Sequence, residues 1–221
     1  MGEARRRKKV GSVISEEKGI YKISVGGVKG GTCFLAASGT DTQHIITAAH
    51  LFGAFNWPAS IAIGIYNGNT WLYRGEGLIK YHSTADLAVV HIPVKLRGTP
   101  MCVAPPSTQI SGEQVRAIGY EINSGTLDTL NGIFEKQLII DNVCNIDGFQ
   151  RRYVGEGWSC SMKGWRGFSG APLLYAEKVI GIYSHSTSPN PVYDPNVPRT
   201  VFSFSSSLIE DFFVRNEVIA S

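Results

Sequence analysis

Short apolar runs separated by chain-breaking residues constrain the fold of this chain more than any other feature. Gly, Asn, Asp and Ser interrupt the first part of the chain so often that strand-like runs cover only residues 20–25, 32–37, 44–48, 61–66, 71–79 and 87–92. One of these runs also alternates large and small side chains, as in a sheet with one buried face. The pattern predicts many short strands rather than long helices, and strands at this spacing are typical of a small antiparallel barrel.

A proline-rich stretch separates these runs from a second set. Residues 93–112 contain four prolines and two glycines, a composition that is typical of a linker. Further strand-like runs follow near residues 114–120, 132–142, 151–160, 171–176, 178–184 and 199–204. The sequence therefore predicts two β-rich units, residues 19–95 and residues 113–205, joined by a linker at residues 96–112.

The start of the chain differs from its body. Residues 1–18 are polar and charged, and five of the 21 basic residues are adjacent there: Arg5, Arg6, Arg7, Lys8 and Lys9. The other 16 basic residues are balanced by 18 acidic ones, so the body lacks the basic excess of a nucleic-acid binder. We expect a solvated, disordered arm, with weak RNA binding by residues 5–9 as the alternative.

The end of the chain carries a helix signal. Ser207 and Glu210 form a capping-box pattern. Helical spacing then places four apolar side chains on one face: Leu208, Ile209, Phe212 and Phe213. We therefore predict a short helix at residues 206–217, with Ser207 as its N-cap, docked on the second β unit.

The cysteines and the hydropathy exclude several kinds of protein. The four cysteines (Cys33, Cys102, Cys144 and Cys160) form no C-x-x-C pair, so we expect no zinc site and no other cofactor. No apolar run reaches the length of about 18 residues that a bilayer-spanning helix needs. The basic N-terminus is not followed by the apolar segment of a secretory signal. We therefore expect no membrane span in this segment.

The peptide Gly167-Phe168-Ser169-Gly170-Ala171-Pro172 carries the strongest chemical signal. A serine hydroxyl is a weak nucleophile and needs a neighbouring base, together with donors for the oxyanion that forms on attack. The backbone N–H groups of Gly167 and Ser169 are the candidate donors. A plain Gly-Ser-Gly turn between strands is the alternative, but the apolar run at residues 173–175 and the segment at residues 181–184, which both follow the motif, favour a nucleophile.

His50 is the candidate base, because an apolar run ends there in Thr47-Ala48-Ala49 and small residues leave room for an imidazole. Four other histidines compete for this role: His44, His82, His91 and His185. We expect His44 to face solvent at a strand start and His91 to be a packed or edge residue, while His82 lacks a comparable context.

Asp86 is the candidate acid that orients the imidazole, since it directly precedes the apolar run at residues 87–92. A strand-start aspartate with no catalytic part is the alternative interpretation. Asp41, which lies before His50 in a turn, is the weaker rival.

In chain order the candidate base, acid and nucleophile are His50, Asp86 and Ser169, and in these contexts the sequence resembles the chymotrypsin-like serine peptidases. The resemblance implies an all-β fold of two six-stranded antiparallel β-barrels with a short C-terminal helix, and a catalytic triad in the cleft between the barrels. It also implies that Ser184 offers backbone hydrogen bonds to the substrate.

The sequence differs from the secreted chymotrypsin-like peptidases at two positions that bear on activation and on the cellular compartment. Phe168 stands where those enzymes use an aspartate to bind a newly freed N-terminus, so we expect no activation by precursor cleavage. Leu51 stands where they carry a cysteine after the histidine. We expect reduced, largely buried cysteines and a reducing compartment, the host cell cytoplasm.

The segment at residues 167–174 is similar to the serine proteases of sobemoviruses and poleroviruses, which are positive-strand RNA viruses. Trp165 and Arg166 stand where those families often place a threonine. The resemblance implies an endopeptidase that is part of a larger polyprotein and processes it in cis and in trans, with host proteins as further substrates.

Substrate specificity is predicted from the residues that flank the serine loop and the strand after it. The candidate substrate-binding residues are Lys163, Arg166, Ser184, His185 and Ser186. Their cationic and hydroxyl groups favour a Glu or Gln side chain at P1, the residue before the cleaved bond. The alternative is that Lys163 and Arg166 simply point into water.

Two other functions remain as alternatives. A protease-fold RNA-binding or capsid module would use the basic arm at residues 5–9. A cellular quality-control protease of the high-temperature-requirement type ranks lower, because such enzymes usually carry Asn before the serine and a PDZ domain after the protease.

Overall fold

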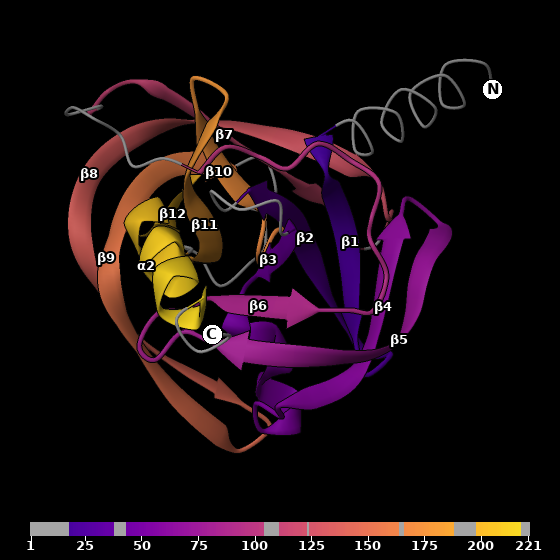
Figure 1. Ribbon diagram of the computed structural model, residues 1–221. Helices are drawn as coiled ribbons and strands as arrows, with labels where there is room; N and C mark the ends of the chain where they lie inside the picture. Colours follow the sequence, from indigo (N-terminus) through magenta and orange to yellow (C-terminus); the bar gives the residue numbers. More distant parts are fainter. Residues whose placement is uncertain are drawn as a thin grey trace, which may run out of the picture.

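Two β-barrels make up the body of the protein. The computed structural model describes residues 18–37, 43–103, 111–122, 124–163, 166–187 and 198–217, and within these ranges twelve strands form two closed barrels (Figure 1). The strand orders are β1-β2-β3-β6-β5-β4 and β10-β11-β12-β9-β8-β7, with every named pair antiparallel. The predicted all-β fold of two six-stranded antiparallel barrels is confirmed. The basic arm at residues 5–9 and Asp41 lie outside the described residues.

The first barrel follows the predicted strands closely. Its strands are β1 (Ile20–Val25), β2 (Lys29–Ala37), β3 (Gln43–Thr47), β4 (Ser60–Asn67), β5 (Thr70–Tyr81) and β6 (Ala88–His91). A 3₁₀ helix that the sequence did not predict, η1 (Ala49–Phe55), follows β3 directly. Alternating side chains of β1 fill the barrel interior, where Tyr21, Ile23 and Val25 are fully buried.

The second barrel contains two strands that are much longer than predicted. Its strands are β7 (Gln114–Tyr120), β8 (Leu127–Ile146), β9 (Phe149–Lys163), β10 (Pro172–Tyr175), β11 (Lys178–Thr187) and β12 (Pro198–Ser205). Asp147 and Gly148 join β8 to β9 with φ angles of 53° and 86°. Positive φ at both residues of a two-residue loop is the requirement of a tight hairpin turn, and Asp-Gly meets it.

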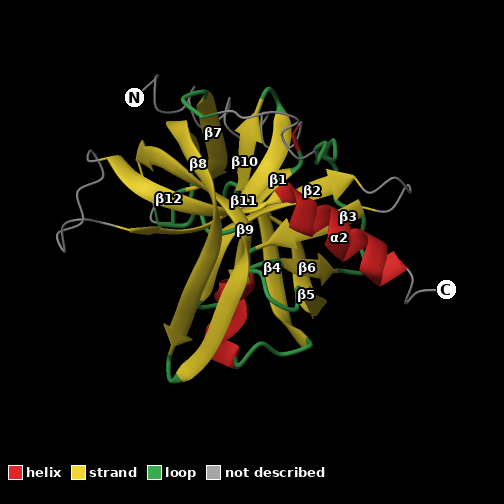
Figure 2. Cartoon of the chain, turned by 90° about the vertical axis from the view of Figure 1, so that its left-hand side faces the viewer, coloured by secondary structure: helices red, strands yellow, loops and turns green. Residues whose placement is uncertain are grey.

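The β8–β9 hairpin extends from its own barrel to the first one, as Figure 2 shows. Its tip packs on η1, where the space left by Gly53 admits Ile146. Trp57 of the first barrel also donates its Nε1–H to the hydroxyl of Tyr153 in β9 at 2.9 Å. The Arg151 guanidinium lies 5.3–5.8 Å from the ring centres of Trp57, Tyr81 and Tyr153. The two barrels are therefore joined by a cation–π cluster as well as by direct packing.

The C-terminal helix α2 (Ser206–Glu217) contacts both barrels. Ile209, Phe212 and Phe213 are buried, and the Phe213 ring stacks on His44 of β3 with ring centres 4.5 Å apart. Docking on the second barrel alone was therefore an incomplete prediction. The expectation that His44 faces solvent was wrong, because this helix covers it.

The helix begins one residue before the predicted N-cap. The Ser205 hydroxyl accepts a hydrogen bond from the Ser207 backbone N–H at 3.3 Å, so Ser205 rather than Ser207 caps the first turn. The prediction placed the cap too late because β12 continues without a loop into α2.

The chain between the barrels runs along both of them. Met101 donates its N–H to Leu35 in β2 at 2.8 Å, and Cys102 accepts from Val179 in β11 at 2.9 Å. Residues 104–110 of the predicted linker lie outside the described residues. Within the described ranges, no helix has both the length and the apolar character that crossing a bilayer requires.

Candidate active site

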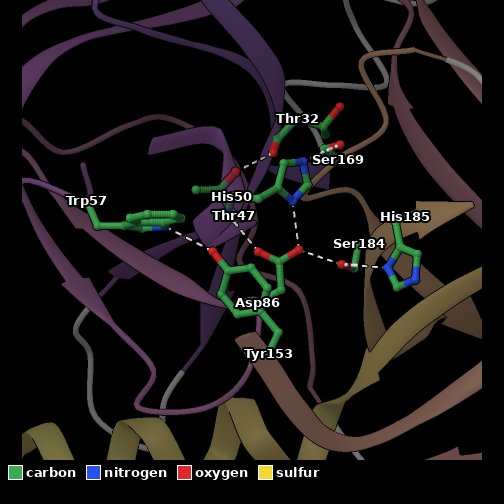
Figure 3. Close-up of polar contacts among 9 residues, drawn as sticks. All are labelled: Thr32, Thr47, His50, Trp57, Asp86, Tyr153, Ser169, Ser184 and His185. Atoms are coloured by element: carbon green, nitrogen blue, oxygen red, sulfur yellow. Dashed lines mark hydrogen bonds and ion pairs between the residues drawn. The ribbon is translucent and has the colours of Figure 1, made fainter. Parts of the chain in front are cut away.

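The structure brings together the three residues that the sequence singled out. His50 lies in η1, Asp86 lies in the loop before β6, and Ser169 lies between β9 and β10. His50 Nε2 is 2.9 Å from Ser169 Oγ, and His50 Nδ1 is 2.7 Å from Asp86 Oδ2. Figure 3 shows this line of contacts continuing from Asp86 to Ser184 and His185. The site therefore has the geometry of a nucleophile, a base and an orienting acid.

The strand before His50 ends in a way that exposes the imidazole to the site. Ala48 and Ala49 are fully buried, so the chain can turn into η1 without displacing larger side chains. Thr47 fixes the end of β3, because its hydroxyl donates to the carbonyl of Thr32 at 2.7 Å. The His50 side chain keeps 20% of its surface exposed, which leaves Nε2 accessible beside Ser169.

Asp86 is a buried carboxylate that is held by hydrogen bonds. It accepts from the His50 ring and, at 2.7 Å, from the His50 backbone N–H, and the Ser184 hydroxyl also donates to it. Burial by itself raises the pKa of Asp86, but the adjacent His50 and these hydrogen bonds outweigh it and lower the pKa below its usual value. An ionised Asp86 places the imidazole proton on Nδ1 and leaves Nε2 free to accept the serine proton.

The loop that carries Asp86 is fixed from two sides. His82 Nδ1 accepts hydrogen bonds from the backbone of Thr84 and Ala85 at 3.2 and 2.9 Å, which makes His82 a structural residue. The β8–β9 hairpin also supports the loop, because Arg151 donates to the His82 carbonyl and Val154 N–H donates to the Thr84 carbonyl, each at 2.8 Å. The second barrel thus holds the acid of the first.

The serine loop has four consecutive backbone carbonyls that each accept a hydrogen bond. The bonds are Ile122 N–H to Arg166 (2.9 Å), Thr32 hydroxyl to Gly167 (2.9 Å), Ala171 N–H to Phe168 (2.8 Å) and Thr32 N–H to Ser169 (2.9 Å). Because C=O and N–H point in opposite directions across a trans peptide, these bonds fix the directions of the N–H groups as well. The loop is therefore held in one conformation before any substrate binds.

Two glycines in this loop cannot be replaced without strain. Gly167 has a φ of 101°, and a Cβ there would lie 2.3 Å from the Tyr120 carbonyl oxygen. Gly170 has a φ of 86°, and its Cβ would lie 2.2 Å from the Thr32 carbonyl oxygen. Both positions need the left-handed backbone that glycine tolerates. The turn that presents Ser169 thus depends on the glycines that flank it.

Phe168 anchors the loop by packing. Its side chain is fully buried in the second barrel, 6.1 Å from the Tyr183 ring. Gly119 makes room for it, since a Cβ on Gly119 would come within 2.9 Å of the Phe168 ring. An apolar anchor thus occupies the position at which the secreted members use an ion pair.

The predicted substrate-binding residues are in different environments. Lys163 and Arg166 are exposed at the two ends of a short segment whose middle residues are not described. Ser186 is half-buried near the end of β11. Ser184 is buried, and its hydroxyl donates to Asp86, while its predicted contact to the P1 side chain stays a prediction. Its backbone contact to substrate stays a prediction.

His185 is bound to the same network. Its Nδ1 lies 3.2 Å from the Ser184 hydroxyl, and its ring stacks on Phe202 with ring centres 4.9 Å apart. Because the Ser184 hydroxyl donates to Asp86, His185 Nδ1 carries the proton of this contact. Burial lowers the pKa of His185, with His50 acting in the same direction and Asp86 against them.

The sequence reasoning missed Thr32, a buried residue of β2 that holds both the serine loop and the end of β3. Its signal was the preceding Gly30-Gly31 pair, because glycine within a strand often marks a close backbone approach. A Cβ on Gly31 would lie 2.7 Å from the Ser169 carbonyl oxygen, so β2 and the serine loop meet there.

The four cysteines lie in different environments. All four are thiols outside any disulfide; Cys33 and Cys160 are buried, Cys144 is half-buried and Cys102 is exposed. Burial, with a smaller effect of Glu135, raises the pKa of Cys160 to about 12. In the part of the chain that the structure describes, no group of three or more His, Cys, Asp or Glu side chains is placed to hold a metal ion.

Comparisons with known proteins place the chain in a family. A family model described as a trypsin-like peptidase domain matches residues 31–182, while a comparison with curated proteins gives no match. Among solved structures, the active form of the Rv3671c protease from M. tuberculosis is 18% identical, with a TM-score of 0.68 over 92% of this chain and 83% of that one.

Two further structures are similar in fold. Deg5 is 17% identical, with a TM-score of 0.60 over 93% of this chain and 91% of its own. The MamO protease domain from Magnetospirillum magneticum is 16% identical, with a TM-score of 0.58 over 90% and 97%. These likenesses agree with the two-barrel architecture, and the family model covers more than half of the sequence. The chain therefore belongs to the trypsin-like peptidases, serine-type hydrolases with the chymotrypsin-like fold.

Proposed function

We propose that this protein is a serine endopeptidase that cleaves peptide bonds through an acyl-enzyme. The observation that carries the proposal is the unbroken line of contacts from Ser169 Oγ to His50 Nε2, and from His50 Nδ1 to Asp86. In the first step the Ser169 oxygen attacks the substrate carbonyl carbon while His50 Nε2 takes the hydroxyl proton. Asp86 stays ionised and stabilises the resulting imidazolium.

The backbone completes the reaction. The N–H groups of Gly167 and Ser169 stabilise the oxyanion of the tetrahedral intermediate, a contribution of about 3 kcal/mol per donor in related sites. The intermediate collapses as His50 gives its proton to the leaving amine, and the acyl group stays on Ser169. Water, activated by His50 in the same way, then releases the acid and restores the serine.

The substrate that we propose is a viral polyprotein, cleaved in cis and in trans. The support is the serine segment at residues 167–174, which is similar to that of sobemovirus and polerovirus proteases. Two features of the site support it further. The buried Phe168 anchors the serine loop without a freed N-terminus, and four cysteines outside any disulfide suit the reducing cytoplasm of a host cell.

For P1 we propose Glu or Gln. Lys163 and Arg166 offer exposed cationic groups on either side of the segment that precedes the serine loop, and both repel a basic side chain. His185 and Ser186 on β11 add polar groups. A peptide library read by mass spectrometry tests this specificity. Preferred cleavage after Glu or Gln supports the proposed P1 specificity. Best cleavage after Arg or Phe would refute that specificity and leave the assignment of Ser169 as the nucleophile unchanged.

The activity itself is tested with matched serine variants. Ser169→Ala is expected to fold normally and to lose several orders of magnitude in kcat/KM, because removal of the nucleophile leaves only residual catalysis. Ser111→Ala, at an exposed serine away from the site, is expected to keep the activity of the wild type. Unchanged cleavage by Ser169→Ala would refute the proposed function.

A further inference from the structure

Thr32 belongs to the first barrel, but it forms hydrogen bonds with the serine loop of the second barrel. It is fully buried in β2, and Figure 3 shows it beside Ser169. Its hydroxyl donates to the Gly167 carbonyl and accepts from the Tyr120 N–H, each at 2.9 Å. Its backbone N–H donates to the Ser169 carbonyl, also at 2.9 Å. One residue of the first barrel is thus bonded to three residues of the second.

The backbone N–H and the side-chain hydroxyl of Thr32 form different hydrogen bonds, so a substitution can remove one group and keep the other. Any residue except proline at position 32 has the backbone N–H group that binds the Ser169 carbonyl. The threonine hydroxyl accepts from the Tyr120 N–H and donates to the Gly167 carbonyl at the same time, because one O–H group carries both a donor and acceptor lone pairs. A valine has the same shape but neither capacity, so it would leave the Tyr120 N–H and the Gly167 carbonyl without this partner.

The Gly167 carbonyl matters because of what lies next to it. The peptide bond before Gly167 is fixed by Ile122, which binds the Arg166 carbonyl at 2.9 Å, and the peptide bond after it is fixed by the Thr32 hydroxyl. Gly167 itself has a φ of 101° and no side chain that would limit rotation. Without the hydroxyl, the backbone on one side of the oxyanion donor would be free to turn.

We propose that Thr32 is a positioning residue whose hydroxyl holds the serine loop in its reactive conformation. Docking of the first barrel on the second then completes the site. This proposal rests on the proposed serine peptidase function.

The experiment compares variants that keep or lose the hydroxyl. Thr32→Val and Thr32→Ala remove it, Thr32→Ser retains it, and Thr129→Val is the control at an exposed threonine of β8. Three quantities are measured: kcat and KM on a cleaved peptide, the rate at which a fluorophosphonate modifies Ser169, and the downfield proton resonance of the bond between His50 and Asp86. The phosphonate reports on the oxyanion hole because its oxygen occupies that site after reaction.

The expected result is a selective loss of transition-state stabilisation. Thr32→Val should lower kcat by about 10- to 100-fold with little change in KM, since a small displacement of a catalytic group costs rates of this order. The phosphonate rate should fall in parallel, while the proton resonance stays in place. Thr32→Ser and Thr129→Val should both remain close to the wild type. Thr32→Ala takes the place of Thr32→Val if the valine variant does not fold.

Different outcomes contradict different statements. A wild type that does not react with the phosphonate would overturn the proposed function, and the part of Thr32 with it. A reactive wild type whose hydroxyl-free variants keep full kcat would overturn only the part of Thr32. Equal losses in Thr32→Ser and Thr32→Val, or loss of the proton resonance in both hydroxyl-free variants, would show that packing and not the hydroxyl is responsible.

Discussion

At the scale of single residues, the chemistry depends on keeping a buried carboxylate charged. Asp86 is 1% exposed, and an unpaired charge at that depth would be very unfavourable. The His50 ring, the His50 backbone and the Ser184 hydroxyl replace the water that Asp86 loses on folding. These donors also orient the carboxylate, so the same bonds that keep it charged fix the imidazole.

Asp86→Asn should lower kcat by about 10⁴-fold, the size of this effect in the Ser-His-Asp triad of chymotrypsin-like enzymes. The asparagine amide places an N–H group toward His50 Nδ1 and so favours the tautomer whose Nε2 carries a proton and cannot accept one. Asp141→Asn, at an exposed aspartate paired with Arg152 on the hairpin, is the control and should keep normal activity. Steady-state kinetics with one peptide substrate measure kcat for both variants. A similar loss in both would contradict the role of Asp86 in orienting His50.

Ser184→Ala should weaken the support of Asp86 in a pH-dependent way. The depressed pKa of Asp86 gives stability that is present above the pKa of the unfolded chain and is lost as the pH falls through the folded value. Removing the Ser184 hydroxyl raises the folded pKa, so acid unfolding should begin at a higher pH. Circular dichroism during acid titration measures the shift. An unchanged acid midpoint would mean that the hydroxyl does not stabilise the carboxylate.

At the scale of elements, the β8–β9 hairpin links the second barrel to the acid of the first. Arg151 binds the His82 carbonyl and lies over three aromatic rings, while Val154 binds the neighbouring Thr84 carbonyl. Strand β9 thus runs directly behind the loop that carries Asp86. A two-stranded ribbon of this length is supported by the surface on which it packs, here η1.

Arg151→Met should therefore reduce both stability and activity. The loss of one hydrogen bond to a charged donor and of the cation–π contacts is expected to cost about 2–3 kcal/mol of unfolding free energy. The neighbouring Arg152→Met is the control, because the Arg152 side chain is exposed and pairs with Asp141 at the surface. Urea unfolding and kcat are measured for both. Equal effects of the two substitutions would contradict a role of the hairpin in holding the Asp86 loop.

Some elements of the structure could be predicted from local sequence, and others could not. β1 and β7 begin and end where their apolar patterns predict, and His50, Asp86 and Ser169 were found from short local contexts. The extension of β8 and β9 was missed although Asp147-Gly148 is a strong turn signal, because the strand ends are stabilised by η1, which lies far away in the sequence. Thr32 and the covered His44 were missed for the same reason, since their partners come from other elements.

At the scale of the whole molecule, acid should destabilise the fold through two half-buried histidines. Burial lowers the pKa of His91, and Lys80 and His44 add to the effect; the pKa of His185 is also lowered. The unfolded chain thus binds more protons than the folded one below the ordinary histidine pKa, so stability should rise as the pH increases from about 5 to about 7.

His91→Gln should reduce that rise, and Lys80→Gln should reduce it in part, because each weakens the proton binding difference. Lys163→Gln, at an exposed lysine of β9, serves as the control and should leave the pH dependence as it is. Thermal unfolding midpoints at several pH values provide the measurement. A wild type that is equally stable at both ends of this range would contradict the assignment of these histidines.

The central claim for the whole molecule is that docking of the two barrels turns Ser169 into a nucleophile with His50 as its base. Acid quenching during turnover of an activated ester, followed by mass spectrometry of the intact protein and its peptides, tests this most directly. The account predicts an acyl group on Ser169 in the wild type and none on that residue in His50→Ala over the same time. A wild type that is never acylated there, or a His50→Ala variant that is acylated as fast, would contradict it.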